Sequence, residues 1–410
     1  MPADTAAGTA RSPISRVELI ALMGMLTATV AFSIDAMLPA LPEIGVALNP
    51  AEPQRAQLVI AAFVLGLGVG TLFTGPLSDA FGRRPVAVAG AVIYSAAALY
   101  AATADSLDAV LVARAVQGLG AAGPRVVTLA IIRDLFAGRQ MARITSYVMM
   151  VFTLVPVLAP SLGAGIAWAF GWRAIFLSFA VFSFISITWL LLRQPETLTP
   201  ENRRPFRPGK LIEGVVAVFS NRHVVVSICV QSLVFGMLFA SLLSSQAVFG
   251  QVFDQAESFP IWFGLMAAIS ASSSWLNAQI VVRFGMRNVV KWALLVQAAL
   301  TALFLLAQLT IWSGAAPLFP IAFLWLTSVF FLAGLGIGNL NAIALEPMGH
   351  MAGMAASIVS STSTIASIAL AAPIGQMFDG TMIPLTACSL LLGSAAFLLI
   401  LAIRDSDGVI

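Results

Sequence analysis

The stretch that decides the fold runs from Gly75 to Pro85 and reads GPLSDAFGRRP, with one carboxylate and two arginines between two long apolar runs. Its glycines allow two helices to approach closely and the chain to turn between them. Asp79 is expected to lie against a helix N-terminus, where a negative charge is favourable, with Arg83 and Arg84 holding its other side. The stretch therefore predicts a charged turn at which two helices move. Gating is expected of five residues: Gly75, Asp79, Gly82, Arg83 and Arg84.

The composition around this turn excludes a soluble globule. Hydrophobic residues make up 60% of the chain and charged residues only 10%, whereas charged residues are about a quarter of a soluble domain. A helix needs about 20 apolar residues to cross a bilayer. Such runs lie near residues 17–38, 57–76, 86–104, 109–131, 144–167, 173–192, 224–247, 260–282, 289–311, 318–344, 354–376 and 382–403. The sequence predicts an all-α membrane protein with twelve transmembrane helices.

The basic residues predict how these helices are oriented. With the N-terminus inside, all but four of the 21 Lys and Arg residues fall in cytoplasmic segments, where they accumulate in membrane proteins. Arg55 and Arg173 fall outside, and Arg114 and Arg125 fall within the fourth apolar run. Both termini are therefore expected in the cytoplasm. The net charge of +3 follows from this topology and does not indicate nucleic-acid binding.

A long connection rich in proline and charge divides the twelve runs into six and six. The expected parts are an N-terminal six-helix bundle, a cytoplasmic linker and a C-terminal six-helix bundle, at residues 1–193, 194–222 and 223–410. A weak internal repeat agrees with this division, because Gly285 follows the eighth run as Gly82 follows the second. Val282 takes the place of Asp79 there, so the second turn lacks the carboxylate.

Away from the first residues of the runs, three charged residues fall inside the predicted transmembrane helices of the first half: Asp35, Arg114 and Arg125. A charge at the bilayer centre costs roughly 2.5–3.5 kcal/mol on insertion scales, so such residues usually face a wet cavity and serve function. At about 1.5 Å per residue, Asp35 and Arg114 reach similar depths in the outer third of the membrane. We expect Asp35 to carry a proton and Arg114 to hold its carboxylate ionised until the proton arrives. The alternative is that these side chains extend to the interface.

Polar residues at helical spacing extend the predicted cavity. Arg114, Gln117 and Arg125 share one face of the fourth run and are expected to line it, although Arg125 could instead be an interfacial anchor. The second half contributes uncharged side chains, which could equally be interhelical hydrogen bonds. The residues expected there are Gln231, Asn277, Asn339 and Asn341.

The pattern G-x-x-x-D-x-x-G-R-R at Gly75–Arg84 resembles the loop between helices 2 and 3 of the major facilitator superfamily of secondary transporters. Arg114–Gly118 resembles the R-x-x-Q-G element of its proton-coupled exporters. Pro160 and Gly163 fit part of the antiporter signature G-x-x-x-G-P-x-x-G-G, but other glycines of that signature are missing. With the segments at 35–44, 133–136, 159–163 and 171–176, the chain resembles the bicyclomycin and chloramphenicol resistance type of bacterial drug:proton antiporter.

This resemblance implies a multi-pass protein of the bacterial inner membrane, acting as a monomer, that exports small amphipathic drugs in exchange for protons. Pro160 and Gly163 would shape a hinge. One carboxylate against two arginines favours neutral or zwitterionic substrates, such as phenicol-type or bicyclomycin-like compounds. No cofactor and no metal are expected, and no enzyme motif is present in the sequence. Two alternatives stay open: a facilitator that imports a sugar or organic anion, and a sensor or scaffold without transport.

Overall fold

The computed structural model describes residues 14–313 and 315–402, and every regular element in these ranges is a helix. Twelve helices are long and apolar enough to cross a membrane, which confirms the predicted fold class. They are α1 (Arg16–Asp35), α3 (Leu58–Phe81), α4 (Arg83–Thr103), α5 (Leu107–Leu135), α6 (Gly138–Phe170), α7 (Arg173–Arg193), α9 (Arg222–Ala247), α10 (Phe259–Phe284), α11 (Met286–Thr310), α12 (Phe319–Leu345), α13 (Ala352–Gln376) and α14 (Ile383–Leu401).

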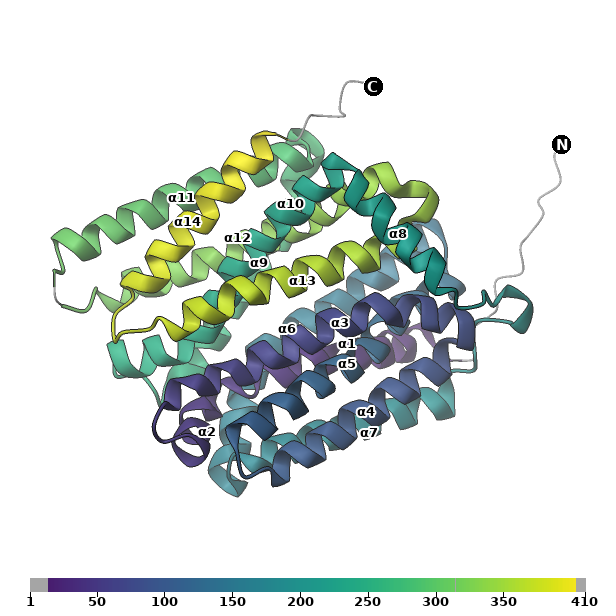
Figure 1. The fold of residues 1–410 in the computed structure, drawn as a ribbon, viewed down its shortest axis with the longest axis horizontal. Helices are drawn as coiled ribbons and strands as arrows, with labels where there is room; N and C mark the ends of the chain where they lie inside the picture. Colours follow the sequence, from purple (N-terminus) through teal and green to yellow (C-terminus); the bar gives the residue numbers. More distant parts are fainter. Residues whose placement is uncertain (1–13, 314, 403–410) are drawn as a thin grey trace.

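The transmembrane helices lie in two groups (Figure 1). In the first group α5 packs against α3 and α4, and α1 packs against α6. In the second group α9 packs against α12, α13 and α14. The groups meet where α3 contacts α13 and where α6 contacts α10. The division into folding units at residues 193 and 223 remains a prediction.

Short helices mark the two ends of the molecule. Helix α2 (Leu41–Leu48) lies at what we name the far end, and α8 (Pro208–Ser220) lies at the opposite end, which we name the linker end (Figure 1). The turn between α3 and α4 is also at the linker end, since the backbone N–H of Arg204 donates to the carbonyl of Asp79 at 2.9 Å. The linker therefore contacts the turn that the sequence predicts as a gate.

Two glycines make the matching turns of the two groups. Gly82, with φ of 105°, ends α3, and Gly285, with φ of 77°, ends α10. These values lie in the left-handed region, which glycine adopts without a steric penalty. The predicted correspondence between Gly82 and Gly285 is therefore visible in the backbone.

Glycines also bring α3 and α5 into direct backbone contact. A Cβ atom on Gly66 would overlap the carbonyl of Ala115, and one on Gly118 would overlap the carbonyl of Phe63. Small residues allow this approach between membrane helices. The contact fixes Arg114, one residue before Ala115, against the backbone of α3.

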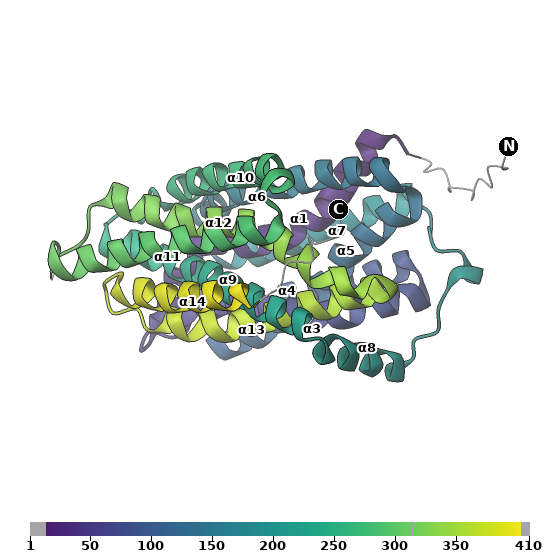
Figure 2. The same cartoon turned by 90° about the horizontal axis from the view of Figure 1, so that it is seen from above.

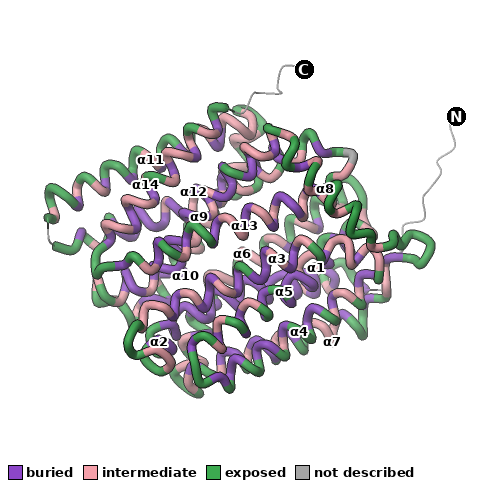
Figure 3. The backbone as a smooth tube through the Cα atoms, in the orientation of Figure 1, coloured by how far each residue is buried: buried purple, intermediate pink, exposed green. Residues whose placement is uncertain are grey.

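The two contacts between the groups differ in extent. Along α13 they begin at Gln376, which donates to the carbonyl of Gln54 just before α3. They continue through Ser361, whose hydroxyl donates to the Gly68 carbonyl at 2.7 Å, to Ser357 beside Gly75. On α10 the buried residues end at Ser273, and Gly264 meets the Val157 carbonyl of α6. Beyond that point α10 has no buried residue. Figure 3 colours the buried, intermediate and exposed residues along the whole bundle. The groups are held together through α6 and α10 mainly toward the far end.

Candidate functional site

Asp35 is the last residue of α1 and is almost fully buried, with 6% of its surface exposed. Within the part of the chain that the structure describes, its carboxylate has no hydrogen bond and no ion pair. Beside it, a Cβ atom on Gly163 of α6 would overlap the carbonyl of Ala36. Asp35 is therefore buried in the protein beside Gly163 of α6, and its expected role in carrying a proton remains a prediction.

Arg114 of α5 is completely buried, and its guanidinium is held by neutral groups. Its Nε donates to the Val59 carbonyl at 3.1 Å, one terminal nitrogen donates to the Gln117 Oε1 at 2.7 Å, and the other donates to the Ser33 carbonyl at 2.8 Å. The rings of Phe63 and Phe179 lie on its sides, with centroids 4.3 and 5.7 Å from Cζ. The charge is therefore stabilised by dipoles and aromatic faces.

This arrangement corrects the expected pairing of Arg114 with Asp35. No ion pair joins them among the described residues. The carbonyls of Ser33 and Val59 and the side chain of Gln117 accept from three of the five N–H groups of the planar guanidinium. Arg114 nevertheless binds the backbone of α1 two residues before Asp35, so it positions the helix end that carries the carboxylate.

Ser33 and Tyr94 belong to the same buried cluster, and sequence reasoning missed both. The Ser33 hydroxyl donates to the Thr29 carbonyl and makes a short contact of 2.5 Å with the Tyr94 hydroxyl. Tyr94 lies on α4, 61 residues further along the chain. The only available signal was a tyrosine within an apolar run, in a chain that has three tyrosines.

The predicted polar face of α5 divides into a packed part and a more open part. Gln117 is fully buried against Arg114, and its Nε2 atom has no partner within the described residues. Arg125, about three turns along the helix, is half-buried and makes no ion pair or side-chain hydrogen bond there. In this structure Arg114 and Gln117 lie in the packing between helices, and their place in a transport cavity remains a prediction.

The second group pairs its predicted polar residues with one another. The Asn339 Nδ2 donates to the Asn277 Oδ1 at 2.7 Å, which joins α12 to α10. The Ser363 hydroxyl donates to the Gln231 Oε1 at 3.1 Å, which joins α13 to α9. Asn341 is half-buried. These contacts fit the interhelical alternative for Gln231, Asn277 and Asn339.

The gate sequence forms a compact ion network at the linker end. Arg83 is 3% exposed and donates to Asp79 at 2.6 Å, to the hydroxyl of Ser78 at 2.8 Å and to Asp134 of α5 at 2.9 Å. Thr197 of the linker donates to the same Asp134 carboxylate at 2.9 Å. Two carboxylates thus neutralise one arginine, and the residues of this network lie in the first group and the linker.

The N-terminus of α4 is capped by Glu196, which corrects the expectation for Asp79. The backbone N–H groups of Arg83 and Arg84 donate to the two Glu196 carboxylate oxygens at 2.9 and 3.0 Å. The N–H groups of Thr197 and Leu198 donate to the same side chain. A carboxylate at a helix N-terminus is favourable, as predicted, but the linker supplies it. Asp79 instead pairs with Arg83, which is four residues away on the neighbouring turn.

Pro160, Gly75 and Arg84 are the remaining residues of the predicted gating set. Pro160 is buried within α6, which continues from Gly138 to Phe170 despite two internal prolines. Gly75 faces Ser357 of α13, whose hydroxyl oxygen would lie 3.0 Å from an added Cβ atom. Arg84 donates to the Leu191 carbonyl of α7 at 2.7 Å. In this conformation Arg83 and Arg84 do not connect the two groups directly.

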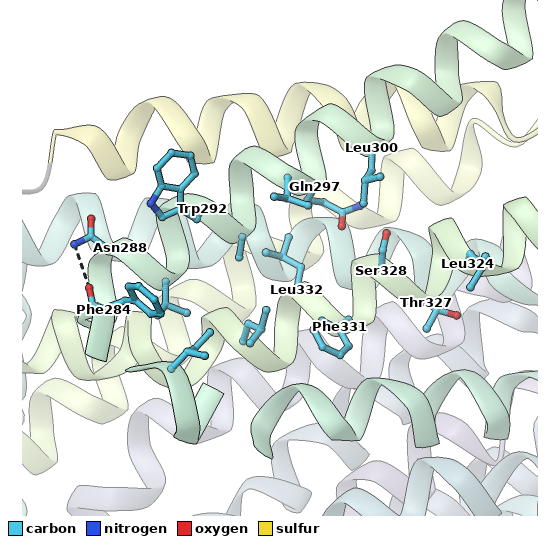
Figure 4. Close-up of a pocket in the computed structure, with 15 residues that line it drawn as sticks. Phe284, Asn288, Trp292, Gln297, Leu300, Leu324, Thr327, Ser328, Phe331 and Leu332 are labelled. Atoms are coloured by element: carbon cyan, nitrogen blue, oxygen red, sulfur yellow. Dashed lines mark hydrogen bonds between the residues drawn. The ribbon is translucent and has the colours of Figure 1, made fainter. Parts of the chain in front are cut away.

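A groove of about 590 Å³ lies elsewhere, between α10, α11 and α12 (Figure 4). Its walls are mostly apolar and include Phe284, Trp292, Leu300 and Leu332, with Gln297 on one side. None of the predicted site residues lines it. The groove is therefore separate from the cluster around Asp35.

Among the described residues, buried charges without opposite partners and an ion network at the turn between α3 and α4 are features of transport and not of catalysis. A family model, that of the Major Facilitator Superfamily, matches residues 23–372. The chain belongs to this superfamily. Transporters of this superfamily bind their substrates between two repeats of six helices. The chain is therefore a multi-pass membrane transporter and not an enzyme.

Curated relatives within the superfamily have names linked to drug resistance. The chain is 28% identical to the bicyclomycin resistance protein homolog of Haemophilus influenzae, over 89% of this chain and 91% of the relative. It is 28% identical to the multidrug resistance protein MdtL of Shewanella oneidensis, over 80% of each chain. Among solved structures, the D-xylose-proton symporter superposes with a TM-score of 0.73 at 15% identity, over 97% of this chain and 99% of that one. The last comparison concerns the fold alone.

Proposed function

We propose that this superfamily member is a proton-coupled exporter of small amphipathic compounds, neutral or zwitterionic, of the phenicol or bicyclomycin kind. The observation that carries the proposal is the Asp35 carboxylate, buried at the end of α1 without a partner among the described residues. An intramembrane carboxylate is costly and usually belongs to a proton or substrate pathway. The names of the resistance-protein relatives support export of drugs.

In the proposed orientation the linker end faces the bacterial cytoplasm, with both termini there. Protonation of Asp35 from outside releases the drug and favours return to the inward-open form. Deprotonation on the inside restores binding. Arg114 positions Asp35 through the Ser33 carbonyl, while the Arg83 network and Gly163 govern the movement of the helices.

Asp35→Asn tests the proposal, because it keeps the side-chain volume and removes the titration. In proteoliposomes with an imposed proton gradient, we expect uphill export of chloramphenicol to stop while equilibrium binding persists. Asp105→Asn is the matched control, since the Asp105 side chain is 97% exposed. Undiminished uphill export by Asp35→Asn would show that the proton is carried elsewhere.

The substrate class has its own test. Arg114 and the half-buried Arg125 would repel a permanent cation in a cleft of low dielectric. Neutral drugs should therefore be exported faster than ethidium, and an inside-negative potential in the cell-like orientation should accelerate neutral-drug export, by about 2.3 kcal/mol per charge per 100 mV. Faster export of ethidium, or no effect of the potential, would contradict this.

Import of a sugar or organic anion is the competing function. The direction of substrate transport, measured in vesicles of known orientation, distinguishes export from import, because an exporter moves its substrate away from the linker end. The observed use of Arg114 disfavours an anion site there, since three of its N–H groups already bind protein acceptors.

A further inference from the structure

Helix α8 presents three different faces around its 13 residues. One face packs on the protein: Gly214 lies against Met354 of α13, and Val218 joins an apolar cluster with residues of α9, α12 and α13. A second face is apolar but exposed, with Ile212, Val216 and Phe219 at spacing i, i+4 and i+7. The third face is polar.

The polar face contains Lys210, Glu213 and Ser220, all of them exposed. A helix that only covered the protein would need one apolar face and would place polar residues on the rest. The additional apolar strip, 64% exposed at Ile212 and 58% at Val216, is left uncovered by the described residues. A second nonaqueous environment, beside the helix bundle, would explain this apolar strip.

The position of α8 identifies that surrounding. It ends at Ser220, and the transmembrane helix α9 begins two residues later at Arg222. The C-terminal part of α8, with Val216 and Phe219, is therefore close to the level at which a membrane-spanning helix starts. Figure 2 shows α8 at the edge of the molecule, where it packs against α13 and α9. An amphipathic helix at this level can lie with its apolar face among the acyl chains.

The charges before and within α8 indicate the kind of lipid. Arg203, Arg204, Arg207 and Lys210 are all exposed and form no ion pair within the described residues. The exposed carboxylates of the same stretch, Glu201 and Glu213, are only two. A basic excess beside an apolar strip is attracted to a bilayer with anionic headgroups.

We propose that α8 is an in-plane membrane helix that inserts Ile212, Val216 and Phe219 into the bilayer and binds anionic phospholipid headgroups through Arg207 and Lys210. The linker then has two attachments: Glu196 and Thr197 hold it to the gate network, and α8 holds it to the membrane surface and to α13. This inference does not depend on which compound the protein transports.

Spin labels at neighbouring positions test the insertion. In a background with Cys229→Ser and Cys388→Ser, shown first to be monodisperse and active, labels are placed by Val216→Cys and, as matched control, Glu213→Cys. In phosphatidylcholine vesicles we expect the label at 216 to collide several-fold more with oxygen than with a water-soluble nickel chelate, and the label at 213 to show the reverse. Equal, water-like collision ratios at both positions would overturn the proposal.

Two further outcomes are informative. If both labels are shielded from both reagents, α8 is covered by protein, such as a second copy of the chain, and the proposal is wrong. Addition of phosphatidylglycerol should raise the oxygen-to-nickel ratio at 216, and Arg207→Gln with Lys210→Gln should remove that increase. If phosphatidylglycerol leaves the ratio at 216 unchanged, the headgroup assignment is wrong. Arg203 and Arg204 stay unchanged in this test because they lie beside the gate.

Discussion

Arg83 and Arg114 are both almost completely buried, but opposite kinds of partner stabilise them. Arg83 is neutralised by two carboxylates, Asp79 and Asp134, whereas Arg114 is surrounded by two carbonyls, an amide and two aromatic rings. A buried ion pair fixes one arrangement, because separating the partners would leave an uncompensated buried charge. A buried cation that only dipoles stabilise leaves the nearby carboxylate, Asp35, unpaired and available for a proton. The first network suits a gate and the second suits proton coupling.

The largest expected effect comes from exchanging each arginine for lysine. Lys keeps the charge but loses the planar fork, so at position 114 it cannot reach all three acceptors. The loss of two charged hydrogen bonds costs roughly 3–6 kcal/mol. Arg114→Lys should abolish uphill export and lower the thermal stability in detergent. Arg83→Lys retains a cation beside two carboxylates and should keep substantial export.

Initial export rates and unfolding temperatures of the two variants check this contrast, with Arg55→Lys as the control because the Arg55 side chain is 40% exposed. If Arg83→Lys and Arg114→Lys lower the export rate and the unfolding temperature equally, the proposed distinction between the two networks is wrong.

The next effect concerns the close approach of α6 to the helix end that carries Asp35. A Cβ atom on Gly163 would overlap the Ala36 carbonyl, whereas one on Gly165 would meet nothing within 4 Å. Overpacking of this kind costs about 1–3 kcal/mol. Gly163→Ala should therefore slow turnover about tenfold or more, and Gly165→Ala should leave it unchanged. If both variants export at the wild-type rate, α6 moves freely past α1 and the packing is not part of the cycle.

A smaller effect is expected where the linker caps α4. Glu196→Gln keeps the shape but removes the charge that four backbone N–H groups approach. The helix-terminus interaction contributes about 0.3–1 kcal/mol, and up to about 2 when partly buried. The balance between inward-open and outward-open forms should shift several-fold, measured by labelling of a cysteine introduced at Ser357 of α13.

The control for the cap is Glu201→Gln, because Glu201 is exposed and lies in the same linker. The same labelling rate in wild type and Glu196→Gln would mean that the cap only stabilises the first group and does not influence the gate.

The sequence predicted local features well and long-range partners poorly. The twelve helices follow from apolar length, and the contact between Asp79 and Arg83 follows from their spacing of four residues. The burial of Asp35 and Arg114 also follows from their places in apolar runs. The capping role of Glu196 was not predicted, because Glu196 lies 112 residues from its partner Arg84. It also belongs to a linker whose charges look like ordinary solvated ones. The Arg114 contacts were misjudged because backbone carbonyls carry no sequence signal, and a nearby carboxylate was the only visible partner.

The smallest effect lies in the second group, where polar residues pair without charge. Asn277 and Asn339 bind each other across α10 and α12, and interhelical hydrogen bonds in membranes contribute about 0.6 kcal/mol on average. Asn277→Ala and Asn339→Ala should each reduce thermal stability slightly, and the double variant should be less damaging than the sum, since the second change removes a partner already lost. Asn341→Ala, which breaks no such pair, is the control. If the two variants are additive in stability but each abolishes export, these side chains contact the substrate, and the second group contributes to the transport site as the sequence first predicted.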